Sequence, residues 1–283
     1  MPSLISFKKY NIFEEINFKF GHLKRTFQRY EEVKDKLDFY EVWYYSNSKK
    51  IKGFAVATKA VAEKNFRPQA VIYNRGGTKD FGQLNALYLL NHMGNWALNG
   101  YFVIGSQYSG NDGSEGKDEV GGADLDDVLN LKTVLEELNL TDNSQIIMTG
   151  ASRGGTMCYL ASTQVDWVNK YIIECGSVDE KDGLDRRQDL KEYRADCFDL
   201  SSAEELKKRS IIYRVGEIKP NSKFLIFHGS GDKAVFPERV LDFVSLLGKT
   251  SIDFEFHYLK DDHNFSQNRH FVDQKSLQWA REV

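Results

Sequence analysis

The sequence lacks the features of a membrane protein or a nucleic-acid-binding protein. Its longest apolar runs fall far short of the roughly 20 residues that a membrane-spanning helix needs. Its net charge of −3 provides no basic surface for nucleic acid. The first residues, MPSLISFKKYNIFEEI, carry charges where a signal peptide would need an apolar stretch. We therefore expect a cytoplasmic protein with neither a membrane nor a nucleic-acid partner.

Cysteine is scarce, and the chain has no repeats, no low-complexity tract and no linker that would divide it. Its three cysteines, Cys158, Cys175 and Cys197, are odd in number and lack the spacing of a metal site. They predict reduced thiols, with Cys158 and Cys175 in apolar surroundings. Of the 283 residues, 41% are hydrophobic and 28% charged, which argues against disorder and for a sizeable core.

Short apolar segments alternate with longer helical ones from Ala70 onward. The expected strands are QAVIYN, YFVIGSQ, QIIMTG, YIIECGS, KFLIFHG and DFEFHYL. The expected helices lie near residues 82–97, 122–138, 153–163, 237–247 and 265–280. This order predicts the α/β class, with a mostly parallel sheet covered by helices on both faces.

Three segments stand outside this alternation. Residues 1–37 predict an N-terminal helical extension, amphipathic at least from His22 onward, although EINFKFG also alternates like a strand. Its apolar stripe is typical of a packed face and could also join two copies of the chain. Residues 39–58 predict a strand hairpin. Within the main domain, residues 38–283, the charged stretch 177–218 predicts a small helical insertion over one edge.

Ser152 lies at the predicted corner between a strand and a helix. Gly150, Ala151, Ser152, Arg153 and Gly154 match the G-x-S-x-G pattern of a nucleophile elbow. Gly150 and Gly154 would remove the crowding around a strained serine and expose its hydroxyl at the carboxyl edge of the sheet. The dipole of the following helix would favour negative charge there. Ser152 is therefore the candidate nucleophile, although a lone serine at such a corner could simply cap a helix.

A serine nucleophile needs a histidine base and an orienting carboxylate. Asp232 follows the predicted strand KFLIFHG, and His263 follows the predicted strand DFEFHYL. Their order along the chain and their places at strand ends match this fold. Asp232 alone could be a turn residue, and Asp261 or Asp262 could compete as the acid. We rank these two lower because they are sequence neighbours of His263.

The remaining histidines show no comparable placement. His228 and His257 lie at or inside predicted strands and are expected to be structural, whereas His22, His92 and His270 are expected to be surface or packing residues. Asp261, Asp262 and His263 could form a metal site, but no further ligands converge with them by sequence. We expect no metal and no organic cofactor.

An acyl-transfer site also needs backbone N–H groups that stabilise the developing oxyanion. One should come from Arg153, the residue after the candidate nucleophile. The other should come from the loop after an earlier strand, where Asn74-Arg75-Gly76-Gly77 allows close approach of the backbone. We assign it to Gly76. Losing one such donor typically costs about 10²- to 10³-fold in rate.

Four stretches together resemble the prolyl oligopeptidase family of serine hydrolases, particularly its dipeptidyl-peptidase and acylaminoacyl-peptidase branch. They are YNRGGTKDFG, SQYSGNDGSEGKDEVGGADLDDV, GASRGG, and HGSGDKAV with DDHNF. The resemblance covers roughly residues 40–283. It implies an α/β-hydrolase fold, a Ser152–Asp232–His263 triad and cleavage of peptide or ester bonds.

The chain departs from this family in two respects. Arg75-Gly76-Gly77-Thr78 replaces the usual His-Gly-Gly-Pro loop, and the chain has no room for the β-propeller of large members. Dipeptidyl specificity is therefore not carried over. Residues 1–37 and 177–218 would shape access to the site instead.

The resulting hypothesis is a serine hydrolase acting on a peptide or small acyl substrate through an acyl-enzyme. A carboxylesterase for small acyl esters and a catalytically silent hydrolase-fold binding protein are alternatives. GASRGG also partly matches the G-x-G-x-x-G pattern of dinucleotide-binding domains. In that pattern Ser152 would block the approach of a pyrophosphate, and Asp232 and His263 would have no role.

Overall fold

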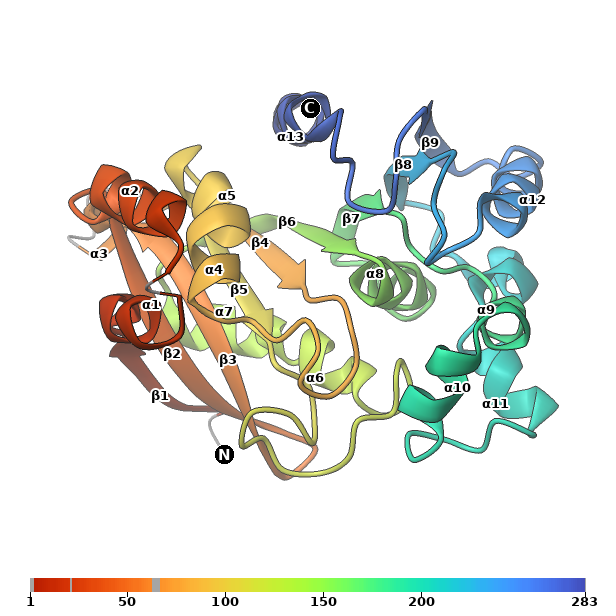
Figure 1. The fold of residues 1–283 in the computed structure, drawn as a ribbon, viewed down its shortest axis with the longest axis horizontal. Coiled ribbons are helices and arrows are strands. Elements are labelled where there is room, and N and C mark those ends of the chain that lie inside the picture. Colours follow the sequence, from red (N-terminus) through yellow and green to blue (C-terminus); the bar gives the residue numbers. More distant parts are fainter. Residues whose placement is uncertain (1–2, 21, 63–66, 283) are drawn as a thin grey trace.

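A single sheet forms the centre of the molecule (Figure 1). The computed structural model describes residues 3–20, 22–62 and 67–282. Within them the strands are β1 Leu4–Lys9, β2 Leu37–Ser46, β3 Lys49–Thr58, β4 Gln69–Asn74, β5 Phe102–Ser106, β6 Asp142–Ala151, β7 Val168–Glu174, β8 Lys223–Gly229 and β9 Asp253–Leu259. Their order across the sheet is β1-β2-β3-β5-β4-β6-β7-β8-β9.

The sheet is mostly parallel, as the alternation of segments predicts. The pairs β1–β2, β2–β3 and β3–β5 are antiparallel. From β5 through β4, β6, β7 and β8 to β9, every neighbouring pair is parallel. The carboxyl ends of these parallel strands therefore meet at one edge of the sheet.

Helices cover both faces of the sheet because its parallel strands are apolar on both sides. The helices are α1 Ile12–Phe20, α2 Lys24–Val33, α3 Lys59–Ala62, α4 Ala86–Tyr88, a π-helical turn Leu89–Met93, α5 Gly94–Leu98, α6 Leu125–Leu129, α7 Leu131–Leu138, α8 Arg153–Gln164, α9 Glu180–Arg186, α10 Gln188–Arg194, α11 Ala203–Lys208, α12 Pro237–Leu247 and α13 Arg269–Arg281. Ala70 and Ile72 of β4 pack into the core shared with α6, α7, α8 and α12. Val71 and Tyr73 pack into the core shared with α1, α2, α5 and α13. The predicted α/β fold with helices on both faces is confirmed.

The prediction that residues 1–37 are helical is wrong at its beginning. Residues 4–9 form β1, which pairs antiparallel with β2 and extends the sheet. Phe7 stacks on Tyr40 of β2 with ring centroids 4.2 Å apart, and this contact between distant segments accounts for the strand. EINFKFG belongs to α1 rather than to a strand, apart from its final glycine, which lies outside the described residues.

The stretch 177–218 contains α9, α10 and α11, two short 3₁₀ turns and, in its described residues, no strand. It connects β7 to β8 and lies beside α12 (Figure 1). Leu184, Cys197 and Phe198 form a small core of their own with Val120. Among the described helices, none combines the length and apolar character needed to span a membrane.

Candidate active site

Ser152 occupies the corner between β6 and α8 in a backbone conformation that side chains rarely adopt. Its φ is 55° and its ψ is −122°. Such a conformation costs energy and is typical of functional sites. The Ser152 N–H donates to the carbonyl of Glu174 at 2.8 Å, which ties the corner to the end of the neighbouring strand β7.

The glycines around Ser152 lie where the structure leaves no space for a side chain. A Cβ atom on Gly154 would lie 2.1 Å from the Asn74 carbonyl oxygen, and one on Gly150 would lie 2.5 Å from the Gly154 carbonyl carbon. The first turn of α8 therefore packs directly against the ends of β4 and β6. This packing holds Ser152 at the carboxyl edge of the sheet.

Asp232 and His263 meet in the loops that follow the neighbouring strands β8 and β9. His263 Nδ1 lies 2.7 Å from Asp232 Oδ2. Asp232 Oδ1 accepts hydrogen bonds from the backbone N–H groups of Ala234 at 2.8 Å and Val235 at 2.9 Å. Burial alone would raise the pKa of Asp232, but the hydrogen bond and charge of His263 and these two N–H groups lower it. The carboxylate is therefore ionised at neutral pH.

Asp261 and Asp262 have other partners. Asp261 Oδ2 accepts from the backbone and side-chain N–H groups of Asn268, both at 2.8 Å. Asp262 Oδ2 accepts from the Ser266 hydroxyl at 2.6 Å. Both carboxylates thus stabilise the loop that carries His263. The structure assigns the hydrogen bond to His263 to Asp232.

His228 supports the loop of Asp232, a role that the sequence did not specify. Its Nε2 lies 3.0 Å from the Val235 carbonyl oxygen and 3.6 Å from Asp232 Oδ2. Burial lowers the pKa of His228, so the ring is neutral and donates its Nε2–H to Val235. Elsewhere, His257 Nε2 lies 2.7 Å from Glu255 Oε1, and the ring of His92 stacks on Tyr88 with centroids 5.0 Å apart.

Ser152 and the loop of Asp232 line the same cavity. The Ser152 hydroxyl forms no direct hydrogen bond with His263 within the described residues. Ser152, Asp232 and His263 nevertheless all follow the carboxyl ends of parallel strands at the same edge of the sheet.

The loop after β4 lies beside Ser152. A Cβ atom on Gly76 would lie 3.6 Å from Ser152 Cβ, and Gly77, with φ +71°, lines the cavity. The buried guanidinium of Arg75 donates to the carbonyl oxygens of Gln107, Phe81 and Lys79 at 2.9–3.2 Å. Arg75 therefore holds this loop from inside.

Arg153 points away from solvent and joins this loop to α8. Its guanidinium lies 2.7 Å from Asp118 Oδ1, pairs with Asp124, and donates to the Gly77 carbonyl at 3.0 Å. Burial alone would raise the pKa of Asp118, but Arg153 lowers it to about 2. Sequence analysis missed this cluster; its only signal was the acidic stretch KDEVGGADLDD, which also suits an exposed loop.

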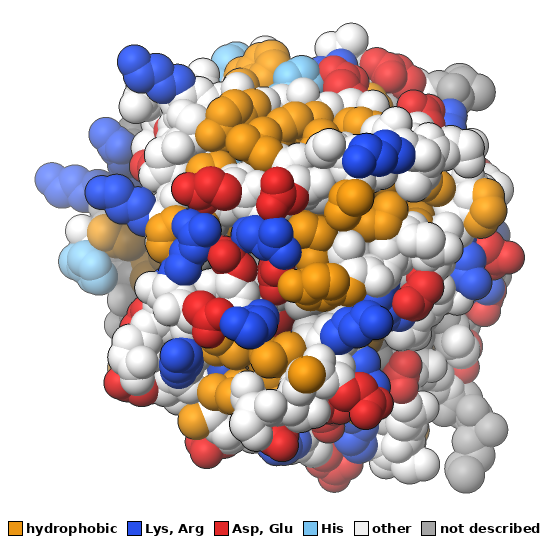
Figure 2. All heavy atoms as spheres, turned by 90° about the vertical axis from the view of Figure 1, so that its right-hand side faces the viewer, with side chains coloured by type: hydrophobic (Ala, Val, Ile, Leu, Met, Phe, Trp, Pro, Cys, Tyr) orange, Lys and Arg blue, Asp and Glu red, His pale blue; other side chains and the backbone are white. Residues whose placement is uncertain are grey.

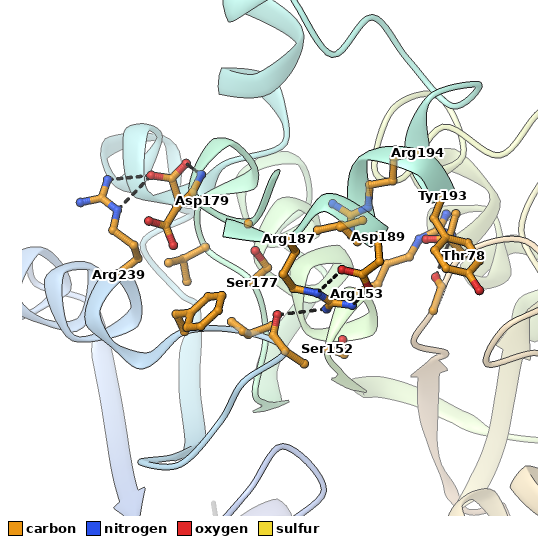
Figure 3. A pocket seen from close by; sticks show the side chains of 18 of the residues that line it. Thr78, Ser152, Arg153, Ser177, Asp179, Arg187, Asp189, Tyr193, Arg194 and Arg239 are labelled. Atoms are coloured by element: carbon orange, nitrogen blue, oxygen red, sulfur yellow. Dashed lines mark hydrogen bonds and ion pairs between the residues drawn. The ribbon is translucent and has the colours of Figure 1, made fainter. Parts of the chain in front are cut away.

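The cavity beside Ser152 measures about 290 Å³ and lies between the sheet edge and the helical insertion (Figure 3). Its apolar lining includes Val178, Leu190, Val235 and Phe236. Arg187, Asp189, Tyr193 and Arg194 come from the insertion and its helix α10. Figure 2 shows the insertion side of the molecule, where both signs of charge are interspersed with apolar patches.

Comparison with known proteins identifies the family. Residues 86–283 match the profile of the prolyl oligopeptidase family. The chain belongs to this family. It is also 24% identical over 212 residues to YtmA, described as an uncharacterized peptidase of Bacillus subtilis; the match covers 74% of this chain and 79% of that protein. The predicted resemblance to the family is confirmed, and the chain is a serine hydrolase by family.

Solved structures show the same fold at lower identity. An acylaminoacyl peptidase bound to Z-Gly-Gly-Phe-chloromethyl ketone superimposes with a TM-score of 0.73 at 18% identity, over 87% of this chain and 42% of that one. A Pyrococcus horikoshii acylaminoacyl peptidase superimposes with a TM-score of 0.72 at 18% identity, over 93% of this chain and 43% of that one. A Pyrococcus furiosus esterase superimposes with a TM-score of 0.66 at 14% identity, over 89% of this chain and 94% of that one. The chain thus spans about two fifths of the acylaminoacyl peptidases and nearly all of the esterase.

Proposed function

We propose that this member of the prolyl oligopeptidase family cleaves peptide or amide bonds through an acyl-enzyme on Ser152. The observation that carries the proposal is the strained Ser152 corner at the same sheet edge as the Asp232–His263 hydrogen bond. The Ser152 side chain does not act as a helix cap, because it accepts no capping hydrogen bond from α8. The two features together match the parts of a serine hydrolase.

In the proposed reaction, His263 Nε2 takes the proton of the Ser152 hydroxyl as its oxygen attacks the substrate carbonyl. The Asp232 carboxylate holds the proton on Nδ1, which leaves Nε2 free to act as the base. It also stabilises the imidazolium that forms. His263 then gives its proton to the leaving amine, and water hydrolyses the acyl-enzyme by the same steps.

The oxyanion would be stabilised by the N–H of Arg153 and by an N–H of the Gly76–Gly77 segment. Two observations support this assignment. Gly76 lies close to Ser152, and Gly77 lines the cavity. The buried contact from Arg153 to the Gly77 carbonyl supports a fixed spacing between the two donors. Preorganised donors of this kind need no rearrangement when the charge develops.

A carboxylesterase is the second candidate. The similarity to the Pyrococcus furiosus esterase favours it, because the match extends over 94% of that chain. The cavity would accept the acyl part of either substrate. A cytoplasmic location is also proposed; it is supported by Cys158, Cys175 and Cys197, which are all free.

Labelling with a serine-directed fluorophosphonate tests the nucleophile. The wild-type protein should be labelled, and the Ser152→Ala variant should not. Ser177→Ala is the matched control, because Ser177 lines the same cavity without the strained backbone, and it should be labelled like the wild type. A folded wild-type protein that resists labelling would favour the silent binding protein.

Substrate panels then separate the two reactions. Acyl-peptides and aminoacyl amides should be cleaved if the protein is a peptidase. Hydrolysis confined to p-nitrophenyl esters would support the carboxylesterase instead. In either case Ser152→Ala should remove the activity.

A further inference from the structure

Cys175 lies between the Ser152 corner and the Asp232–His263 pair. It is the first residue after β7, is fully buried, and has a φ of 47°. Its N–H donates to the Phe227 carbonyl at 2.9 Å. The preceding residue, Glu174, accepts a hydrogen bond on its backbone carbonyl from the Ser152 N–H. The thiol is therefore held by backbone contacts at the centre of the candidate active site, although the proposed reaction does not use it.

The Cys175 sulfur, an Asp232 carboxylate oxygen and a His263 ring nitrogen all lie within 4.8 Å of one another. In the described part of the chain, this is the one group of three such side chains close enough to bind a single ion. Thiolate, imidazole and carboxylate are the ligands that Zn²⁺ prefers, at roughly 2.0–2.3 Å from the metal. Ligands around a tetrahedral ion are then roughly 3.3–3.8 Å apart. Small movements of the side chains would reach that geometry.

We propose that Cys175, Asp232 and His263 form an inhibitory site for a thiophilic divalent cation such as Zn²⁺. The side chain of His263 is 23% exposed, so the ion can approach from that side and keep a water as its fourth ligand. Mg²⁺ and Ca²⁺, which prefer oxygen ligands, should not bind there. The inhibitory effect rests on the proposed function; the binding of the ion does not.

Binding would remove the base of the proposed reaction. The thiol releases its proton to solvent when its sulfur binds the cation. As the cation takes Nδ1 of His263, the proton of the neutral ring moves to Nε2. A ring protonated at Nε2 cannot accept the Ser152 proton, and Asp232 no longer orients it. Inhibition thus follows from a change of tautomer without any covalent change.

Inhibition is tested with fluorophosphonate labelling and substrate hydrolysis in the presence of Zn²⁺ or Mg²⁺, each variant normalised to its own uninhibited rate. Zn²⁺ should inhibit the wild type, and Mg²⁺ should not. Cys175→Ser should raise the Zn²⁺ concentration for half-inhibition by about 10- to 100-fold or more, because even groups that only support metal ligands contribute that much. Cys197→Ser is the matched control and should respond like the wild type. Equal Zn²⁺ sensitivity of Cys175→Ser and wild type would overturn the proposal.

Metal binding is tested separately in the Ser152→Ala protein, which needs no activity. Cd²⁺ should give an ultraviolet absorption band from a bound thiolate. This band should be absent from the double variant that carries both Ser152→Ala and Cys175→Ser. A band that persists would show that the ion binds elsewhere, and no band at all would also refute the site. If Cys175→Ser does not fold, as judged by circular dichroism, Cys175→Ala takes its place. Failure of labelling without Zn²⁺ would refute the proposed function and leave this binding test intact.

Discussion

The two walls of the cavity are stabilised in different ways. The sheet-edge wall carries Ser152 and part of the loop that holds Asp232, and backbone hydrogen bonds and close glycine contacts hold it in place. The insertion wall, formed by α9 and α10, also depends on side-chain ion pairs with α12. Arg239 binds Asp179 at 2.7 Å, and Arg186 binds Glu238 at 3.1 Å.

This difference separates chemistry from substrate fit. Reacting groups must be held within a fraction of an ångström, which backbone contacts achieve and exposed ion pairs do not. Variants of the sheet-edge wall should therefore change kcat, and variants of the insertion wall should change KM.

Asp232→Asn should lower kcat by about 10⁴-fold with little change in KM, because a neutral amide no longer fixes the tautomer of His263. Steady-state kinetics on the best substrate of the panel measures this. Asp189→Asn is the matched control on the insertion wall and should change kcat by no more than about three-fold, because its pair with Arg187 is exposed. A comparable loss of kcat in both variants would refute the division.

Arg153→Met should lower the free energy of unfolding by about 3–5 kcal/mol, because it leaves Asp118 and Asp124 buried without a counter-charge. Urea titration followed by circular dichroism measures the change. The control Arg186→Met removes the half-exposed pairs with Asp182 and Glu238 and should cost no more than about 1 kcal/mol. Equal losses would show that the half-exposed pairs of Arg186 contribute as much stability as the buried pairs of Arg153.

Acid should weaken the same buried cluster. The pKa of Asp118 is lowered from 3.8 to about 2 in the folded protein, so its ionisation stabilises the fold above pH 4. That contribution, about 2 kcal/mol, should be lost as the pH falls from about 4 to 2. Urea titrations at several pH values should measure the loss of unfolding free energy relative to pH 7 for each protein. This loss should be smaller in Asp118→Asn than in the wild type. An unchanged pH dependence in the variant would contradict this assignment.

Arg239→Met should raise KM by about five-fold and leave kcat within about two-fold, because the partly exposed pair with Asp179 is worth about 1 kcal/mol. Salt should screen this pair, so 0.5 M NaCl should raise the wild-type KM and change the variant less. If Arg239→Met lowers kcat instead, the insertion wall also positions the reacting groups.

The sequence predicted those parts of the fold and site that depend on local pattern. The alternation of apolar segments predicted the mostly parallel sheet, and α12 begins and ends where its periodicity indicated. Asp232 and His263 were predicted because residues after neighbouring parallel strands meet at one edge. The hydrogen bond between them follows from that geometry.

Features that depend on contacts between distant segments escaped prediction. β1 is only six residues long, and it becomes a strand by pairing with β2. Arg153 reaches Asp118 and Asp124, about 30 residues earlier in the chain, whose charges alone suggested an exposed loop. Cys175 carries no local signal either, because its closeness to His263 arises from the order of β7, β8 and β9.

The division of the cavity bears on the design of selective inhibitors. An electrophile that only captures Ser152 would also react with many other serine hydrolases. An arm that crosses the cavity to pack on Leu190 and Tyr193 of α10 would contact the 177–218 insertion, on the far side of the cavity from Ser152, the proposed nucleophile. Potency would come from the electrophile, and discrimination between enzymes would come from the arm.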